Sequence, residues 1–290
     1  MVGIAWYVKM AKYFFTPADK TGDTVILRGE TAHHLLHVLR LRPGATVTLC
    51  DGARTDYTAV LQPAEATASR PAINCTFQIT HQSRCTTEPP TPITVYQSLP
   101  KGDKFESIIQ KSVELGAANI VPLYTAHTLA KNVEKKIARW QKIADSAAVQ
   151  CNRGILPEVT PPQRFADALE KAIKNALSAD EKSTNSNGTT DATTSAMAPA
   201  LWLAALSPSE AGEETLPTLA QLFRMPNLPQ NEPLPAAINI WIGPEGGFAR
   251  EEVDRLLAAG AHAVSLGPRV LRTETAAPAL LAQISLVWES

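Results

Sequence analysis

The spacing of hydrophobic and polar residues divides the chain into two parts. Up to about Arg84, apolar residues alternate with polar ones in short runs such as 24–28 and 46–50. Runs of this length, separated by turn-forming residues, predict strands that build a small β-barrel. Helical spacing interrupts them at 31–41 and predicts a short helix, with Thr31 at its N-cap.

After a proline-rich linker at 86–92, strand-like and helix-like segments alternate. Apolar runs at 93–99, 119–124 and 201–206 predict buried strands. Because helical patterns lie between these runs, the alternation predicts an α/β domain. Its sheet should be mostly parallel and covered by helices on both faces.

The predicted helices have recognisable ends. Asp103 stands before the first of them, with Glu106 in the capping-box position, and Gly116 should end it. Asn132 is predicted to cap the second helix. The stripe that this second helix should bury consists of Val133, Ile137, Trp140 and Ala144.

Residues 176–199 break the alternation. They are rich in Ser, Thr, Asn, Asp and Ala and contain no aromatic residue, so we interpret them as a flexible insertion. A short helix is predicted at about 216–223. The expected domains are therefore 11–85 for the β-barrel and 93–290 for the α/β domain.

Composition narrows the class of protein. The 290 residues are 44% hydrophobic with a formal net charge of −1, which indicates a globular chain and excludes a generally basic nucleic-acid coat. No apolar run approaches the roughly 20 residues of a membrane span, and no secretion signal is recognisable. The cysteines lack C-x-x-C spacing, which favours reduced thiols in a cytoplasmic protein. His33 and His37 share a helix face without an evident third ligand, so we expect no metal.

Two special turns near the C-terminal end carry the candidate chemistry. The apolar run 238–242 leads into Gly-Pro-Glu-Gly-Gly, which we call the first glycine turn (243–247). A helix-like segment at 250–259 follows, and then the second turn (266–271). This order is typical of a ligand crevice at the carboxyl ends of parallel strands. Glycines allow a ligand to approach the backbone, although a tight strand-to-helix turn without a ligand is the alternative.

The second turn leads into a doubly basic segment. Arg269 and Arg272 are three residues apart, and Glu274 follows closely. In a loop, the two guanidinium groups could bind a phosphate or the oxygens of a base. The alternative is an Arg–Glu pair at the start of a closing helix. That helix should begin with an N-cap at Thr273 or Thr275, which would place Pro278 in its first turn.

These segments resemble a known family. The stretches 242–247 and 266–276, together with 101–106 and 109–116 upstream, match the pattern of the 16S ribosomal RNA uridine N3-methyltransferases of the SPOUT class. The resemblance covers nearly the whole chain except the insertion. It implies a C-terminal SPOUT domain with a trefoil knot, an N-terminal PUA-like β-barrel that helps to hold RNA, and a homodimer.

The resemblance also implies a cofactor, S-adenosyl-L-methionine, bound in the knot. The residues expected to bind it are Leu203, Ile242, Gly243, Pro244, Glu245, Gly246, Gly247, Leu266, Gly267, Arg269, Val270, Leu271 and Thr273. The implied substrate is a uridine of 16S rRNA in the 30S subunit.

Methyl transfer to N3 of uracil requires the loss of the N3 proton. The enzyme therefore needs a base, or cationic groups that stabilise the uracil anion. We predict that Arg272 has this electrostatic role and that Glu274 orients it. The candidate phosphate contacts are Arg40, Arg42, Lys104 and Arg153, with solvated surface charge as the alternative for each.

Three positions depart from the family pattern. Ala126 and His127 stand where the family usually has an acidic residue and an arginine, and Val149 replaces a usual glutamate. His127 could still supply a donor or a base. Two alternatives to the rRNA methyltransferase therefore remain. One is an RNA-binding homologue with lost or altered activity, and the other is a methyltransferase acting on another RNA.

Overall fold

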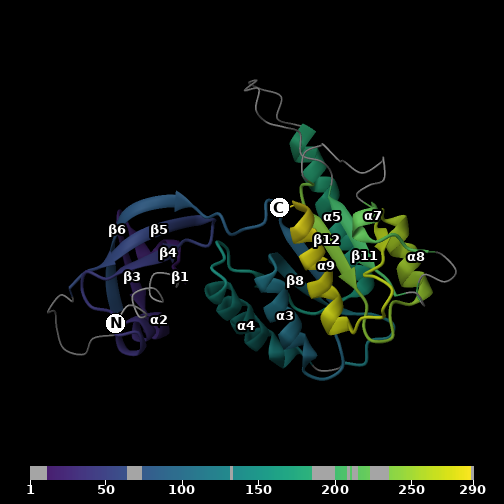
Figure 1. Cartoon of the computed structure of the whole chain (residues 1–290), viewed down its shortest axis with the longest axis horizontal. Helices are drawn as coiled ribbons and strands as arrows, with labels where there is room; N and C mark the ends of the chain where they lie inside the picture. The colour runs from purple at the N-terminus through teal and green to yellow at the C-terminus, as the bar shows by residue number, and fades with distance from the viewer. Residues whose placement is uncertain are drawn as a thin grey trace. The chain divides into compact units, whose positions relative to one another are not determined.

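The computed structural model describes residues 12–63, 74–130, 133–184, 200–207, 210, 215–222 and 235–288. The chain forms two compact units (Figure 1). The first holds Met1–Glu88 and Asp145–Leu156, and the second holds Pro89–Ala144 and Pro157–Ser290. The segment Asp145–Leu156 thus joins the first unit, although it lies inside the predicted domain 93–290.

A curled six-stranded sheet forms the first unit, in the order β1-β4-β5-β6-β3-β2. Neighbouring strands are antiparallel except β1 and β4, which are parallel. Alternate residues such as Val25, Leu27 and Phe77 are buried in its core, as the period of two predicts. The strands are β1 (Lys12–Phe14), β2 (Lys20–Thr21), β3 (Thr24–Arg28), β4 (Thr46–Cys50), β5 (Thr55–Leu61) and β6 (Asn74–Arg84).

The helix of the first unit begins earlier than predicted. Helix α2 (Gly29–His33) starts directly after β3 and continues into a π-helical turn, η2 (His34–Val38). Gly29 has a φ of +62°, and this left-handed conformation lets the chain turn from strand into helix at once. Thr31 therefore lies inside the helix, and its assignment as the N-cap was wrong.

A seven-stranded sheet forms the second unit. Its order is β10-β8-β7-β12-β11-β13, with β9 beside β8, and every registered pair is parallel. The predicted parallel α/β sheet is therefore confirmed. The strands are β7 (Ile93–Ser98), β8 (Ala117–Tyr124), β9 (Glu158–Val159), β10 (Gln163–Arg164), β11 (Leu201–Ala205), β12 (Ile238–Ile242) and β13 (His262–Val264).

Helices cover both faces of this sheet. On one face, Phe165 and Leu169 of α5 and Leu256 of α8 belong to the same buried cluster as Trp241. Residues of opposite parity point to the other face, where α9 contacts both α3 and β12 (Figure 1). The helices are α3 (Lys104–Glu114), α4 (Ile137–Gln150), α5 (Phe165–Thr184), α7 (Leu219–Leu222), α8 (Arg250–Ala258) and α9 (Thr273–Trp288).

The predicted start of α3 is only partly correct. Asp103 stands at the N-cap, but its carboxylate accepts a hydrogen bond from Lys136 Nζ at 2.7 Å instead of capping the helix. Glu106 accepts one from Arg139 at 2.8 Å, so the expected capping box does not form. Gly116, with a φ of +94°, follows the helix end as predicted. Asn132 lies outside the described residues.

Two further boundaries differ from the predictions. Helix α5 runs to Thr184 and so includes 176–184 of the predicted insertion, while 185–199 lie outside the described residues. Good helix formers, Ala, Leu, Glu and Lys, continue the helix through 176–184. The flexibility of the insertion stays a prediction. Helix α9 begins at Thr273, which makes Pro278 its sixth residue and places it beyond the first turn. Pro278 has no N–H to donate to the carbonyl of Glu274 one turn earlier.

Candidate active site

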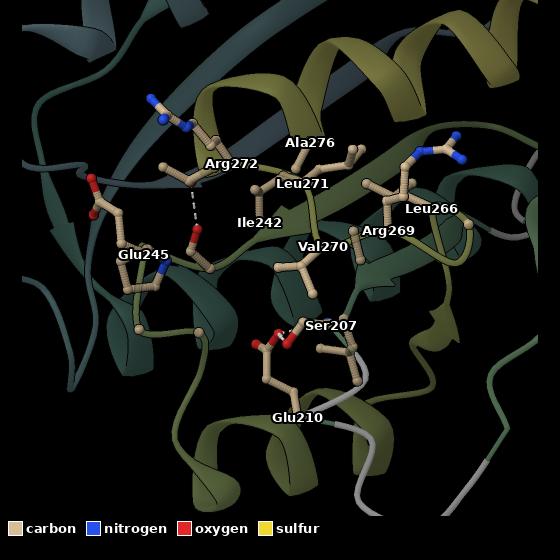
Figure 2. A pocket seen from close by; sticks show the side chains of 18 of the residues that line it. Ser207, Glu210, Ile242, Glu245, Leu266, Arg269, Val270, Leu271, Arg272 and Ala276 are labelled. Atoms are coloured by element: carbon tan, nitrogen blue, oxygen red, sulfur yellow. Dashed lines mark hydrogen bonds between the residues drawn. The ribbon is translucent and has the colours of Figure 1, made fainter.

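A cavity of about 400 Å³ lies at the carboxyl ends of β11 and β12 (Figure 2). Both turns singled out in the sequence line it, and so do all the predicted cofactor-binding residues except Leu203, which is buried within β11. The lining residues are Lys104, Ala205, Leu206, Ser207, Glu210, Ile242, Gly243, Pro244, Glu245, Gly246, Gly247, Leu266, Gly267, Arg269, Val270, Leu271, Arg272, Thr273 and Ala276.

The first glycine turn is closed by its own backbone. The N–H of Gly247 donates to the carbonyl of Pro244 at 3.0 Å, and Gly247 has a φ of +71°. A Cβ on Gly243 would lie 3.1 Å from the backbone nitrogen of Phe248. The turn therefore has no room for a side chain at Gly243, and it presents main chain to the cavity.

Thr273 joins this turn to two other segments. Its hydroxyl donates to the carbonyl of Gly243 at 2.7 Å and accepts a hydrogen bond from Gln97 Nε2 at 3.0 Å. Both side chains are buried. The end of β7, the first glycine turn and the start of α9 are thereby held at fixed distances around the cavity.

Glu210 and Ser207 were not among the site residues predicted from the sequence. Glu210 accepts hydrogen bonds from the backbone N–H and hydroxyl of Ser207 at 2.7 and 2.6 Å, and from the N–H of Phe248 at 2.7 Å. Figure 2 shows both side chains on the side of the cavity away from Arg272. Their Ser-x-x-Glu spacing is a capping-box pattern, and this signal would have identified them.

Charged side chains gather at the edge of the cavity. Lys104 Nζ lies 3.5 Å from Glu245 and 3.4 Å from Glu274, while Arg272 Nη1 lies 3.9 Å from Glu274. Arg269 and Arg272 point in different directions (Figure 2). The two arginines therefore do not form one clamp, and Arg272 is the one beside the carboxylates.

Glu274 is a carboxylate that stays ionised at neutral pH. Its burial alone would raise its pKa, but a backbone hydrogen bond, Lys104 and Arg272 together lower the pKa below its ordinary value of 4.5. A carboxyl group with a lowered pKa is a weak base. It therefore suits the orientation of Arg272 better than the removal of a proton from uracil.

The predicted RNA contacts differ in their surroundings. Arg40 and Arg42 are exposed on the first unit. Arg153 donates two hydrogen bonds of 2.8 Å to Glu88, and both side chains are only 2% exposed. This burial argues against a phosphate contact at Arg153. Lys104 is half-exposed between its two carboxylates.

The described residues contain neither a candidate metal site nor a membrane-spanning helix. Among the residues that the structure describes, no group of three or more His, Cys, Asp or Glu could hold a metal ion. The rings of His33 and His37 lie with centroids 4.9 Å apart. Within the same described ranges, no helix has the length and apolar character that crossing a membrane requires.

The fold and the cavity define an α/β enzyme that binds a small ligand where its parallel strands end. Comparisons with known proteins identify the class further. The family described as RNA methyltransferase domain matches residues 87–285, and the family described as RNA methyltransferase PUA domain matches residues 27–67. The chain therefore belongs to the RNA methyltransferase family, as the resemblance predicted.

Individual relatives match along nearly the whole chain. A Ribosomal RNA small subunit methyltransferase E from Synechocystis sp. is 34% identical, and the match covers 98% of this chain and 80% of that protein. One from Bacillus subtilis is 30% identical, with 97% and 98% covered. The crystal structure of a Ribosomal RNA small subunit methyltransferase E from Neisseria gonorrhoeae bound to S-adenosyl methionine is 29% identical. Its TM-score is 0.70, and 96% of this chain and 98% of that chain are covered.

These matches confirm the predicted fold class and the predicted methyltransferase. The parallel sheet corresponds to the methyltransferase domain and the curled sheet to the PUA domain. The trefoil knot stays a prediction. The roles of the individual site residues also stay predictions, although the cavity brings most of them together.

Proposed function

We propose that the chain transfers the methyl group of S-adenosyl-L-methionine to N3 of a uridine in 16S rRNA of the small ribosomal subunit. One observation carries the proposal. Both special turns line a single cavity, in a chain whose 29% identical neighbour of the same fold is bound to S-adenosyl methionine. Relatives of up to 34% identity are named as small-subunit rRNA methyltransferases.

The residues of the cavity fit this cofactor. Its volume of about 400 Å³ lies within the usual range for small-molecule sites. Gly243 and Gly247 line the cavity without side chains, so a flat ligand can lie against the main chain there. When bound, the cofactor supplies an electrophilic methyl group on a sulfonium.

Arg272 is proposed to stabilise the uracil anion. Its side chain is 80% exposed at the edge of the cavity, so it can reach a base that enters from outside. Negative charge that develops on the uracil carbonyl oxygens would be stabilised by the guanidinium. Glu274, held by Lys104, is proposed to limit the orientations of Arg272.

The first unit is proposed to hold the rRNA. It contains the match to the PUA domain family, and the exposed Arg40 and Arg42 could contact phosphates. Lys104 remains a weaker candidate because two carboxylates already surround its ammonium group. An rRNA substrate also implies a cytoplasmic location.

A homodimer is the second part of the proposal. Helix α9 is apolar over most of its circumference, and Leu286 near its end is 72% exposed. A helix that is apolar on nearly all sides is normally buried. A second copy of the chain is the partner that we propose for the exposed part of α9.

A methylation assay tests the function. Purified 30S subunits, free 16S rRNA and tRNA would each be incubated with the protein and isotope-labelled S-adenosylmethionine, and the labelled nucleotide would be mapped by mass spectrometry. We expect one labelled uridine with the methyl group on N3. Label found only in tRNA would contradict the proposal. So would cofactor binding without any transfer to rRNA, the result expected of an inactive RNA-binding homologue.

A further inference from the structure

The loop after β8 contacts the back of the first glycine turn. His127, at the centre of this loop, has its Nδ1 atom 3.1 Å from the carbonyl oxygen of Gly246 and 3.0 Å from that of Gly247. The contact joins segments about 120 residues apart in the sequence. His127 is thus placed to influence the shape of a turn that lines the cavity.

The two carbonyl groups determine which nitrogen of His127 carries the proton. A carbonyl oxygen only accepts hydrogen bonds, so Nδ1 must be the donor to both Gly246 and Gly247. In the neutral ring, the unprotonated nitrogen is then Nε2. His127 is not among the residues that line the cavity, which separates it from the atoms that would react.

The loop itself is held in place on both sides of His127. Thr125 and Thr128 are joined by hydrogen bonds of 2.9 and 3.0 Å that close a tight turn. The N–H of Ala126 donates to Glu252 Oε1 at 2.9 Å, and the other oxygen of Glu252 accepts from the N–H of Ala249 at the start of α8. The imidazole is therefore presented to the glycine turn by a well-anchored loop.

The fit between ring and turn is close. A Cβ added to Gly246 would lie 3.2 Å from the Cβ of His127. Gly246 therefore permits the approach that lets Nδ1 reach two successive carbonyl groups. Peptide groups that flank glycines reorient easily unless something holds them, because glycine has few steric restrictions.

We propose that His127 is a positioning residue for the cofactor site. Its Nδ1–H donates hydrogen bonds to the carbonyl groups of Gly246 and Gly247, and so keeps the first glycine turn in its cofactor-binding shape. The inference rests on the proposed function, because it names the residue that pre-forms the same cavity. The sequence left two roles open for His127, a hydrogen-bond donor or a general base. The geometry points to the hydrogen-bond donor. Without the hydrogen bonds, the turn would hold this shape for a smaller fraction of the time, and apparent affinity falls in proportion to that fraction.

Two measurements on the full-length protein test this inference. The first is the tautomer of His127 in the cofactor-free protein, read from ¹⁵N chemical shifts of the imidazole; we expect the Nδ1–H form. The second is S-adenosylmethionine affinity by calorimetry. We expect His127→Ala to bind about five- to tenfold more weakly, the usual effect of losing one or two modest hydrogen bonds.

Two further variants separate positioning from folding. His127→Asn places an amide N–H near the position of Nδ1, so it should bind within about twofold of the unchanged protein. His81→Ala, on an exposed position of β6, is the matched control and should not alter affinity. At saturating cofactor the turnover of His127→Ala should recover to within about twofold, because the defect lies in binding.

The inference and the proposed function fail in different ways. An Nε2–H tautomer, or equal cofactor affinity of His127→Ala and the unchanged protein, would overturn the role of His127 even if uridine is methylated. Weaker binding that His127→Asn does not restore would also overturn it. A protein that binds the cofactor with the predicted dependence on His127 but methylates no rRNA would overturn the proposed function alone.

Discussion

Arg272 is the side chain on which the proposed chemistry depends most directly. It is exposed at the edge of the cavity and lies 3.9 Å from Glu274. Replacing it with alanine should lower kcat about 100-fold, because removing one preorganised electrostatic group typically costs that much. Cofactor affinity should change by less than about threefold. Single-turnover methylation of rRNA together with calorimetry would measure both effects.

The control for Arg272 is Arg250→Ala. Arg250 is also exposed, at 70%, but it pairs with Asp254 on α8 outside the cavity. The Arg250→Ala variant should have the same turnover as the unchanged protein. If Arg272→Ala kept the turnover of Arg250→Ala, the electrostatic role of Arg272 would be wrong and another group would have to stabilise the anion.

Gly267 and Gly260 form a matched pair for testing the second turn. Both have positive φ angles, +115° and +89°, and a Cβ would meet no atom within 4 Å at either position. Alanine should therefore destabilise the fold similarly at both sites, by about 1 kcal/mol. Only Gly267 lines the cavity, so only Gly267→Ala should also weaken cofactor binding.

Thermal melts with and without S-adenosylmethionine would compare the two glycine variants. A cofactor-dependent increase in Tm that is reduced in Gly267→Ala but retained in Gly260→Ala is the expected result. Equal increases would show that the backbone conformation at Gly267 does not matter for binding.

At the scale of elements, the ion pair between Glu88 and Arg153 ties the segment after α4 to the end of the β-rich sheet. Burial would raise the pKa of Glu88, but the hydrogen bonds and charge of Arg153, together with the N–H of Gly154, lower it below its ordinary value of 4.5. A lowered carboxyl pKa stabilises the fold above the unfolded value, and this contribution is lost as pH falls through the folded value.

Glu88→Gln tests this pair. At pH 7 it should lower the free energy of unfolding by about 3 kcal/mol, because the buried arginine loses the negative charge of Glu88. The difference in stability from the unchanged protein should shrink as pH falls below 4.5.

Urea unfolding between pH 3 and 7 measures this difference, with Glu170→Gln as the control. Glu170 pairs with Lys174 on the surface, where solvent screens the pair, and its replacement should leave stability nearly unchanged. If the stability difference between Glu88→Gln and the unchanged protein did not depend on pH, the stabilising role of the ionised Glu88 would be wrong.

The elements show what local pattern predicts and what it does not. Strands such as β3 and β12 were predicted at their observed bounds, because alternating apolar residues mark a half-buried strand and an unbroken apolar run marks a fully buried one. The first glycine turn was predicted because its residues specify an unusual backbone. By contrast, Asp103 has the local sequence of a helix cap but bonds to Lys136, which is 33 residues away. No local pattern contains that partner.

The same holds for the site: residues marked by a local pattern were predicted, and residues whose role depends on distant partners were not. Residues close in sequence to a glycine turn were found, and most of them line the cavity. The local Ser-x-x-Glu pattern of Glu210 was overlooked, and its contact with the N–H of Phe248, 38 residues later, is not visible in any local pattern. Leu203 was placed in the site by resemblance, but the sheet buries it. Arg153 has the charge of a phosphate contact, and only the fold reveals the buried Glu88 beside it.

At the scale of the whole molecule, the proposed homodimer can be tested through α9. Leu286→Glu places a charge on an apolar position that is 72% exposed in the single chain. If a second copy covers it, the charge should raise the dimer dissociation constant at least 100-fold, because burying an unpaired charge is costly. Light scattering after size-exclusion chromatography measures this.

Leu177→Glu is the control for the dimer. Leu177 on α5 is similarly exposed, at 60%, and should leave the dimer intact. A monomeric unchanged protein, or a Leu286→Glu variant that remains dimeric, would show that α9 is not the interface.

The hydrogen bonds of Thr273 also have a consequence for folding. They join Gly243 to a residue 30 positions away and Gln97 to one 176 positions away, so the cavity depends on contacts of very long sequence separation. Such contacts form late, because closing large loops is entropically slow. During synthesis, the strands and the first glycine turn emerge before α9 exists. The nascent chain can therefore complete its β-rich unit early, but it gains a closed donor cavity only when its last helix joins the sheet.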